Sequence, residues 1–265
     1  MTARQLWVED GLRELPQSLH RKPKEGSKTN ATIPPAPDVQ ATDRRPVASP
    51  WHTVGLLLIL ALITYGGVRT HGTTTKTAPQ TNLIHLYLAV MAGEWALVFY
   101  VWRGIRRRGV TLREFIGWSG SNLNAFWRIL ATAGVFWLVW EGSARAMHLL
   151  LGPSDTANVT AMLPHSSLQV LVWCIVSGTA GFCEEVLYRG YLQRQFAAWT
   201  GSAVAAIATQ AVIFGASHGY QGTKQMIIIS VLGALYGILA HWRRTLAPGI
   251  IAHTWSDIYG GWLHP

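Results

Sequence analysis

From about residue 51 onward, the chain alternates between apolar runs and short polar connections. Seven apolar stretches follow one another, at residues 51–68, 83–102, 126–140, 168–183, 203–216, 226–240 and 246–262. Nothing in the pattern supports β-strands. Several stretches are shorter than the roughly 20 residues that a helix needs to cross a bilayer, so they must extend into their polar flanks or be sheltered by protein. The pattern predicts an all-α fold, a polytopic membrane helical bundle of about seven spans.

Residues 1–50 show neither a helical nor an alternating apolar pattern. They hold six of the 13 acidic residues, together with repeated prolines such as Pro34, Pro35 and Pro37. A segment of this kind cannot bury enough apolar surface to fold by itself. We therefore predict three parts: a disordered cytoplasmic tail at 1–50, the first two membrane spans at 51–109, and a core at 110–265.

The composition supports the membrane assignment and bears on the partners. Hydrophobic residues make up 49% of the chain and charged residues 13%, whereas a soluble domain averages about 25% charged. The net charge is +9, and the tail and loops on one predicted side hold 17 Lys and Arg against four on the other. This asymmetry favours positive-inside topology over nucleic-acid binding. It predicts a multi-pass protein of the cell membrane, with the lipid bilayer as partner and a cytoplasmic N-terminus.

Three short segments in the last third of the chain carry ionisable side chains beside apolar stretches. The first contains Glu184, Glu185 and Arg189. On a helix, Glu185 and Arg189 lie four residues apart and can pair, while Glu184 points about 100° away. The second segment ends in His218, four residues after Phe214.

The third segment places His253 and Asp257 four residues apart, on one face of a helix. Each segment alone has a structural interpretation: a helix-end charge cluster, a packing histidine, or an aspartate that orients a histidine. Together they point to function, because ionisable residues inside a membrane face the bundle interior and mark functional sites.

A simple vertical arrangement of the spans poses a difficulty for a shared site. If a helix ended at Glu184, that residue would lie toward the cytoplasm, and His218 would end the next helix on the opposite side. The difficulty disappears if the fifth apolar stretch is re-entrant or starts deep, so one of the predicted spans is a candidate re-entrant segment.

The three segments resemble the motifs of the CAAX-protease and bacteriocin-processing family, also called the Abi or type II CAAX prenyl endopeptidase family. Its EExxxR motif is matched by Glu184, Glu185 and Arg189. Its FxxxH motif is matched by Phe214 and His218, and its HxxxN or HxxxD motif by His253 and Asp257. The three motifs occur in order on consecutive apolar segments. The resemblance covers roughly residues 110–265, and identifies that range as a protease core.

The resemblance implies an intramembrane protease that hydrolyses a peptide bond. The short loops and the polar tail favour a bacterial protein. By analogy, Glu184 with His218 would activate a water molecule, and His253 with Asp257 would stabilise the oxyanion. Glu185, Arg189 and Phe214 would be supporting residues. The substrate would be a membrane-associated protein or peptide, such as a leader-bearing bacteriocin or a lipid-anchored tail.

The metal requirement divides this family into metalloproteases and metal-independent glutamyl proteases. Glu184, His218, His253 and Asp257 could together bind zinc, since they offer imidazole and carboxylate ligands. We favour the metal-free mechanism without a cofactor, because the chain has no compact HExxH pair.

Two other functions remain open at this stage. A catalytically inactive relative would act as a bacteriocin-immunity or scaffold protein, and would not need Glu184. A proton-coupled membrane transporter would also place Glu and His residues inside the membrane. Glu94, an acid within the second apolar stretch, gives the transporter slight support, although a polar contact between helices explains it as well.

Overall fold

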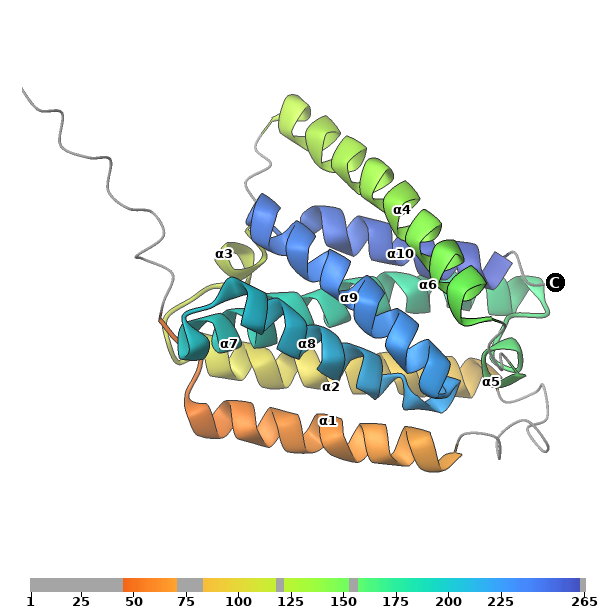
Figure 1. Cartoon of the computed structure of the whole chain (residues 1–265), viewed down its shortest axis with the longest axis horizontal. Coiled ribbons are helices and arrows are strands. Elements are labelled where there is room, and N and C mark those ends of the chain that lie inside the picture. The colour runs from red at the N-terminus through yellow and green to blue at the C-terminus, as the bar shows by residue number, and fades with distance from the viewer. Residues whose placement is uncertain (1–44, 71–82, 118–121, 153–156, 263–265) are drawn as a thin grey trace, which may run out of the picture. The chain divides into compact units, whose positions relative to one another are not determined.

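The computed structural model describes residues 45–70, 83–117, 122–152 and 157–262, and every regular element in these ranges is helical. Most of the predicted tail therefore lies outside the described residues. The elements are α1 (Pro50–Thr70), α2 (Leu83–Arg106), α3 (Leu112–Ile116), α4 (Leu123–Leu151), α5 (Ala157–Thr160), α6 (Ser167–Glu184), the π-helical η5 (Glu185–Leu192), α7 (Gln193–Thr200), α8 (Ala203–Ser217), the 3-10 turn η6 (Gly219–Gln221), α9 (Thr223–Arg243) and α10 (Ala247–Trp262) (Figure 1).

The structure confirms the predicted fold class, an all-α helical membrane bundle. Within the described residues, five helical segments are long and apolar enough to cross a membrane: Pro50–Arg69, Leu83–Arg106, Leu123–Leu151, Ser167–Thr200 and Thr223–Arg243. The other two predicted stretches are also helical, as α8 and α10, with 15 and 16 residues. Both are short of the roughly 20 residues that a span requires.

The prediction that a helix ends near Glu184 is wrong. Helical structure continues without a break through α6, η5 and α7, so that residues Ser167–Thr200 form one segment of 34 residues. The apolar run stops earlier because the second half buries polar side chains, which bond to the backbone of other segments. Gln193 donates to the carbonyl of Gly237 at 2.9 Å, and Gln195 donates to the carbonyl of Ala48 at 3.2 Å.

A tight hairpin after this long helix resolves the difficulty of the vertical arrangement. Gly201 ends α7 in the left-handed conformation with φ 67°, and the Ser202 side chain caps α8 by accepting from the Ala205 amide. The number of residues from Glu184 to this turn is nearly the same as the number from the turn to His218. The two antiparallel arms therefore bring Glu184 and His218 to one level, and their meeting does not require a re-entrant segment.

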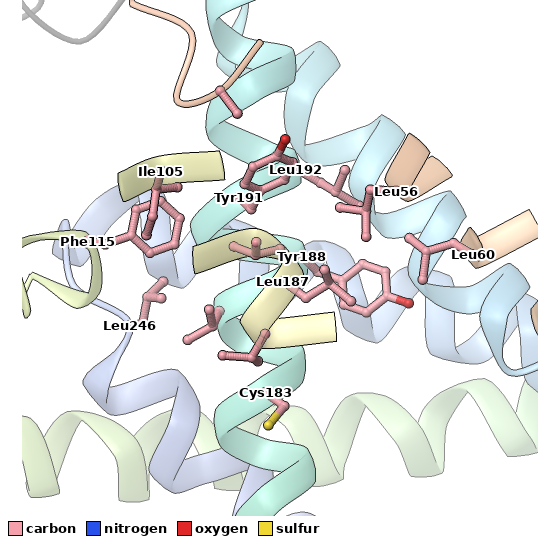
Figure 2. Packing of buried hydrophobic residues seen from close by; sticks show 14 of the residues in the cluster. Leu56, Leu60, Ile105, Phe115, Cys183, Leu187, Tyr188, Tyr191, Leu192 and Leu246 are labelled. Atoms are coloured by element: carbon pink, nitrogen blue, oxygen red, sulfur yellow. The ribbon is translucent and has the colours of Figure 1, made fainter. Parts of the chain in front are cut away.

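The segment that carries the first motif lies at the centre of the packing. Every residue of η5 is buried. Figure 2 shows apolar side chains from α1, α2 and α3, together with Leu246 just before α10, arranged around Cys183 and η5. They include Leu56, Leu60, Ile105, Phe115 and Leu246. A π-helical segment inside an α-helix commonly marks a functional site, and here it holds both Glu185 and Arg189.

The end of the predicted tail is fixed to the same long helix. Ala48 is buried, and its backbone N–H and C=O both bond to the Gln195 side chain at 3.2 Å. A little further on, His52 Nδ1 lies 2.7 Å from the Tyr191 hydroxyl, and the Thr53 hydroxyl lies 2.9 Å from it. The chain entering α1 is thus tied to η5 and α7.

Glycines allow the helices that carry the site to approach one another. A Cβ at Gly215 on α8 would overlap with the Met226 carbonyl oxygen and the Ser230 hydroxyl on α9. A Cβ at Gly181 on α6 would overlap with the Thr254 side chain on α10. Small residues at such positions are the usual means of close helix packing in membranes.

Replacing Gly215 by Ala is expected to destabilise the protein, since the added methyl group has no room. The expected loss is about 1–3 kcal/mol, typical of overpacking, measured from thermal unfolding in detergent. Gly178→Ala on α6 is the matched control, because a Cβ there meets nothing within 4 Å. The control is expected to be neutral or slightly stabilising, as Ala for Gly in a helix usually is. Equal effects of the two substitutions would contradict this account of the α8–α9 contact.

Candidate active site

The carboxyl group of Glu184 lies between the imidazole rings of two histidines from other helices. Its Oε1 is 4.0 Å from His218 Nε2, and its Oε2 is 3.5 Å from His253 Nε2. The Glu184 and His218 side chains are 18% and 16% exposed and His253 is 9% exposed, so all three are largely covered. The residues that the sequence predicted for one site are therefore brought together. We call Glu184, His218, His253 and Asp257 the carboxyl–imidazole cluster.

His218 caps the C-terminal end of α8 and has a defined orientation. Its Nδ1 lies 2.8 Å from the carbonyl oxygen of Phe214, one turn back along the helix. A carbonyl oxygen only accepts, so Nδ1 carries the proton and donates. In the neutral ring, Nε2 is then an acceptor, and this is the atom that faces Glu184.

Glu185 and Arg189 form a buried ion pair beside the carboxyl–imidazole cluster. Arg189 Nη1 lies 2.9 Å from Glu185 Oε1, with side-chain exposures of 0% and 1%. The same Oε1 lies 3.3 Å from His253 Nδ1. This contact corrects one expectation from the sequence: the acidic group bonded to the His253 ring is Glu185, whereas Asp257 faces the ring's other nitrogen at the longer distance of 4.0 Å.

Arg189 is held by two neighbouring helices, α8 and α9. Its Nη2 donates to the Gly233 carbonyl on α9 at 3.1 Å. Its guanidinium group lies over the rings of Phe214 on α8, at 4.2 Å, and Tyr236 on α9, at 5.0 Å. Cation–π contacts of this kind stabilise a desolvated cation. Arg189 therefore links η5 to the helices on both sides of it.

Phe214, predicted as a supporting residue, lies among the groups of the site. Its ring contacts Arg189 and meets the His218 and His253 rings edge-on, at centroid distances of 4.9 and 6.1 Å. The Tyr236 ring stacks on the His253 ring, with a centroid distance of 5.1 Å. These aromatic rings restrict the orientations that the two imidazoles can adopt.

Asp257 has the most open position in the cluster. Its side chain is 33% exposed, and its Oδ2 lies 4.0 Å from His253 Nε2. Its backbone carbonyl accepts a hydrogen bond of 3.0 Å from the Trp173 indole on α6. The 4.0 Å gap exceeds a direct hydrogen bond and is typical of a contact bridged by water or by a substrate atom.

Sequence reasoning missed several residues that position the cluster. The Tyr188 hydroxyl donates to Ser217 Oγ at 2.9 Å, and Ser217 donates to the Phe214 carbonyl at 2.7 Å. Trp173 and Tyr236 were also missed. Only Tyr188 offered a signal, since it follows Glu184 by one helical turn, whereas the other contacts depend on tertiary packing.

Zinc was the alternative cofactor considered from the sequence. Among the residues that the structure describes, no group of three or more His, Cys, Asp or Glu side chains is arranged so that it could hold a metal ion. The donor set for zinc would again be Glu184, His218, His253 and Asp257. The choice between a metal-free and a zinc mechanism stays a prediction, which the chelation experiment below addresses.

Comparison with known proteins supports the resemblance seen in the motifs. Residues 166–259 match the family described as type II CAAX prenyl endopeptidase Rce1-like. This range contains all three motifs, from Glu184 to Asp257. No curated protein and no solved structure gives a significant match to the chain. The predicted resemblance is therefore confirmed over this range, and with the apolar helices it supports a membrane protease of the CAAX type in general terms.

Removing the Arg189 charge is expected to be strongly destabilising. Arg189→Met leaves the Glu185 carboxylate buried without its cation, and breaking a buried pair in this way costs about 3–5 kcal/mol. The double variant Glu185→Gln/Arg189→Met is expected to be more stable than Arg189→Met alone, because it leaves no unpaired charge. Thermal unfolding of the three proteins in detergent measures both effects. A double variant less stable than the single one would show that the pair matters for reasons other than charge.

Proposed function

We propose, from the family match of residues 166–259 and the geometry of the carboxyl–imidazole cluster, that the protein is an intramembrane endopeptidase. It would hydrolyse a peptide bond of a membrane-associated protein or peptide, with a lipid-anchored tail as one candidate. The observation that carries the proposal is the position of Glu184, whose two carboxyl oxygens face His218 Nε2 and His253 Nε2 at 4.0 and 3.5 Å.

The first chemical step is activation of water. The 4.0 Å gap between Glu184 Oε1 and His218 Nε2 accommodates a water oxygen about 2.8 Å from each. Both atoms can accept a hydrogen bond from this water, because the His218 proton is on Nδ1 and donates to Phe214. Glu184 takes one proton as general base while the water oxygen attacks the carbonyl carbon of the substrate.

The second step is stabilisation and breakdown of the tetrahedral intermediate. Glu185 orients His253, because its Oε1 accepts a hydrogen bond from His253 Nδ1. The other ring nitrogen, Nε2, therefore points into the cluster. When Nε2 also carries a proton, it donates to the oxyanion. Asp257 Oδ2 lies 4.0 Å from this nitrogen and donates to the oxyanion itself only when it is protonated. The C–N bond then breaks, and Glu184 returns the proton to the leaving amine.

Glu184→Gln is expected to abolish cleavage, because an amide cannot take a proton from water. A loss of about 10²–10⁴-fold is typical for removal of a general base. The measurement is cleavage of a peptide library by the full chain in liposomes, read by mass spectrometry. Glu141→Gln on α4 is the matched control, since that acid is no part of the cluster, and it is expected to retain activity.

The same experiment distinguishes the two other functions. A protein in which Glu184→Gln leaves biological function intact, with no cleavage by either form, would be an inactive immunity or scaffold relative. Proton or solute flux into the liposomes without any cleaved product would indicate a transporter. Either result would overturn the proposed protease function.

Chelation is expected to leave the cleavage rate unchanged, because the proposed steps use only Glu184, His218, His253 and Asp257. The test is turnover before and after treatment with a strong zinc chelator, followed by addition of zinc. Loss of turnover on chelation and its recovery with zinc would assign the same four residues to a metal site, and would replace the metal-free mechanism.

A further inference from the structure

Arginine side chains gather around the short helix α3, at the end of the bundle where α2 and α9 finish (Figure 1). They come from the end of α2 and the turn after it, from α3 itself, and from the connection between α9 and α10. Five of them are exposed, namely Arg106, Arg107, Arg108, Arg113 and Arg244. We call these five residues the α3 arginine surface. It lies at the end of the helices that the sequence predicts to be cytoplasmic.

Direct contacts join the three segments that carry the α3 arginine surface. The buried Phe115 ring of α3 belongs to one apolar cluster with Ile105 near the end of α2 and with Leu246 before α10. Figure 2 shows these three side chains beside one another. The carbonyl oxygen of Ile116 accepts from the Leu246 N–H at 2.9 Å and from the Thr245 hydroxyl at 3.2 Å. The arginines are therefore far apart in sequence but are held on one small region of the surface.

The positive charge of this surface is not compensated by acids of the same segments. Within residues 103–117, 193–203 and 240–250, Glu114 is the one acidic residue. Its carboxylate accepts from the Thr111 N–H at 2.9 Å and from the Thr111 hydroxyl at 2.8 Å. Among the described residues, no carboxylate forms an ion pair with any of the five arginines. An external anion can therefore bind here without displacing an internal partner.

Tryptophan rings flank the α3 arginine surface at the ends of two membrane-length helices. The Arg106 guanidinium lies over the Trp102 ring of α2 at 4.9 Å, and the Arg243 guanidinium lies over the Trp242 ring of α9 at 5.1 Å. The Trp242 side chain is 68% exposed. Tryptophan is enriched where a membrane helix leaves the hydrocarbon core and enters the headgroup layer. The surface therefore lies at the level where the phosphate groups of phospholipids are found.

We propose that the α3 arginine surface binds the headgroup phosphates of anionic phospholipids. Guanidinium groups bond phosphate oxygens through two parallel N–H donors, and basic residues beside membrane helices are typical of sites for anionic headgroups. Positive-inside topology explains why arginines lie at this end of the helices. Their convergence on α3 without a carboxylate partner is the additional feature that indicates a binding surface. The proposal does not depend on the proposed hydrolysis.

Lipid bound at this surface would also stabilise the helix that carries Glu184. A Cβ at Gly190 in η5 would overlap with the Phe115 ring of α3, and the Arg194 guanidinium of α7 lies over the same ring at 5.0 Å. A headgroup held by Arg113 would therefore keep α3 pressed against η5 and α7. Anionic lipid is thus expected to raise the unfolding temperature of the protein.

The first test measures which lipid the full chain retains. The protein is released from micelles that contain equal amounts of phosphatidylglycerol and phosphatidylcholine, and native mass spectrometry gives the ratio of the two lipids bound. The wild type is expected to retain phosphatidylglycerol in excess. In Arg108→Gln/Arg113→Gln/Arg244→Gln the ratio is expected to fall at least about tenfold, since each arginine near an anionic surface contributes a factor of about five to binding.

The matched control removes the same amount of charge from the other end of the helices. Arg69→Gln/Arg145→Gln/Lys224→Gln is expected to keep the lipid ratio of the wild type. Equal losses in the two triple variants would show that the lipid responds to net charge alone, and would overturn the proposal. A wild type that retains the two lipids equally would overturn it as well.

The second test measures thermal unfolding in liposomes of phosphatidylcholine with and without phosphatidylglycerol. Phosphatidylglycerol is expected to raise the unfolding temperature of the wild type and of the control variant, and to have little effect on the variant at positions 108, 113 and 244. The increase is expected to shrink at about 1 M salt, where charges are screened beyond about 3 Å. The same increase caused by inorganic phosphate in detergent without lipid would assign the surface to free phosphate and overturn the lipid assignment. None of these measurements requires peptide cleavage, so they decide the proposal even if the protein is not a protease.

Discussion

The buried ion pair between Glu185 and Arg189 is the interaction on which the arrangement of this site depends. A fully desolvated pair is expensive unless its remaining polar atoms find partners. Here the partners are the Gly233 carbonyl on α9, the rings of Phe214 and Tyr236, and His253 on α10, while Glu185 Oε2 and Arg189 Nε have no hydrogen-bond partner among the described residues. The contacts that the pair does make require α8, α9 and α10 to converge on η5. That convergence is also what places two imidazoles against Glu184.

The two adjacent glutamates have different contacts, one in the buried ion pair and the other in the carboxyl–imidazole cluster. Glu185 faces the protein interior and is committed to Arg189 and His253. Glu184 faces about 100° away on the same helix and meets the imidazole nitrogens at distances that leave room for a third molecule. One glutamate thus holds the structure together, while its neighbour remains available for chemistry.

Much of the fold and the site could be predicted from the sequence, because membrane helices and paired charges leave local signals. The spacing of four residues between Glu185 and Arg189 predicted their ion pair, and the seven apolar stretches predicted the helices. The end of the fourth helix could not be predicted, because Gln193 and Gln195 are buried by bonds to Gly237 and Ala48, far away in sequence. For the same reason the bond from Glu185 to His253 escaped prediction. The division of the chain at residues 50 and 109 stays a prediction.

The length of the helix that carries Glu184 constrains what the protein could cut. Glu184 lies near the midpoint of the 34 residues Ser167–Thr200, so roughly 25 Å of helix extends to either side of it at 1.5 Å per residue. If Glu184 is the base, as proposed, a substrate segment would have to reach it and expose a carbonyl carbon there. An intact helix shields its carbonyls with its own hydrogen bonds, so chains that unwind easily, or enter already extended, would be preferred. Selectivity would then depend on how readily a guest peptide loses its secondary structure, as much as on the side chains it carries.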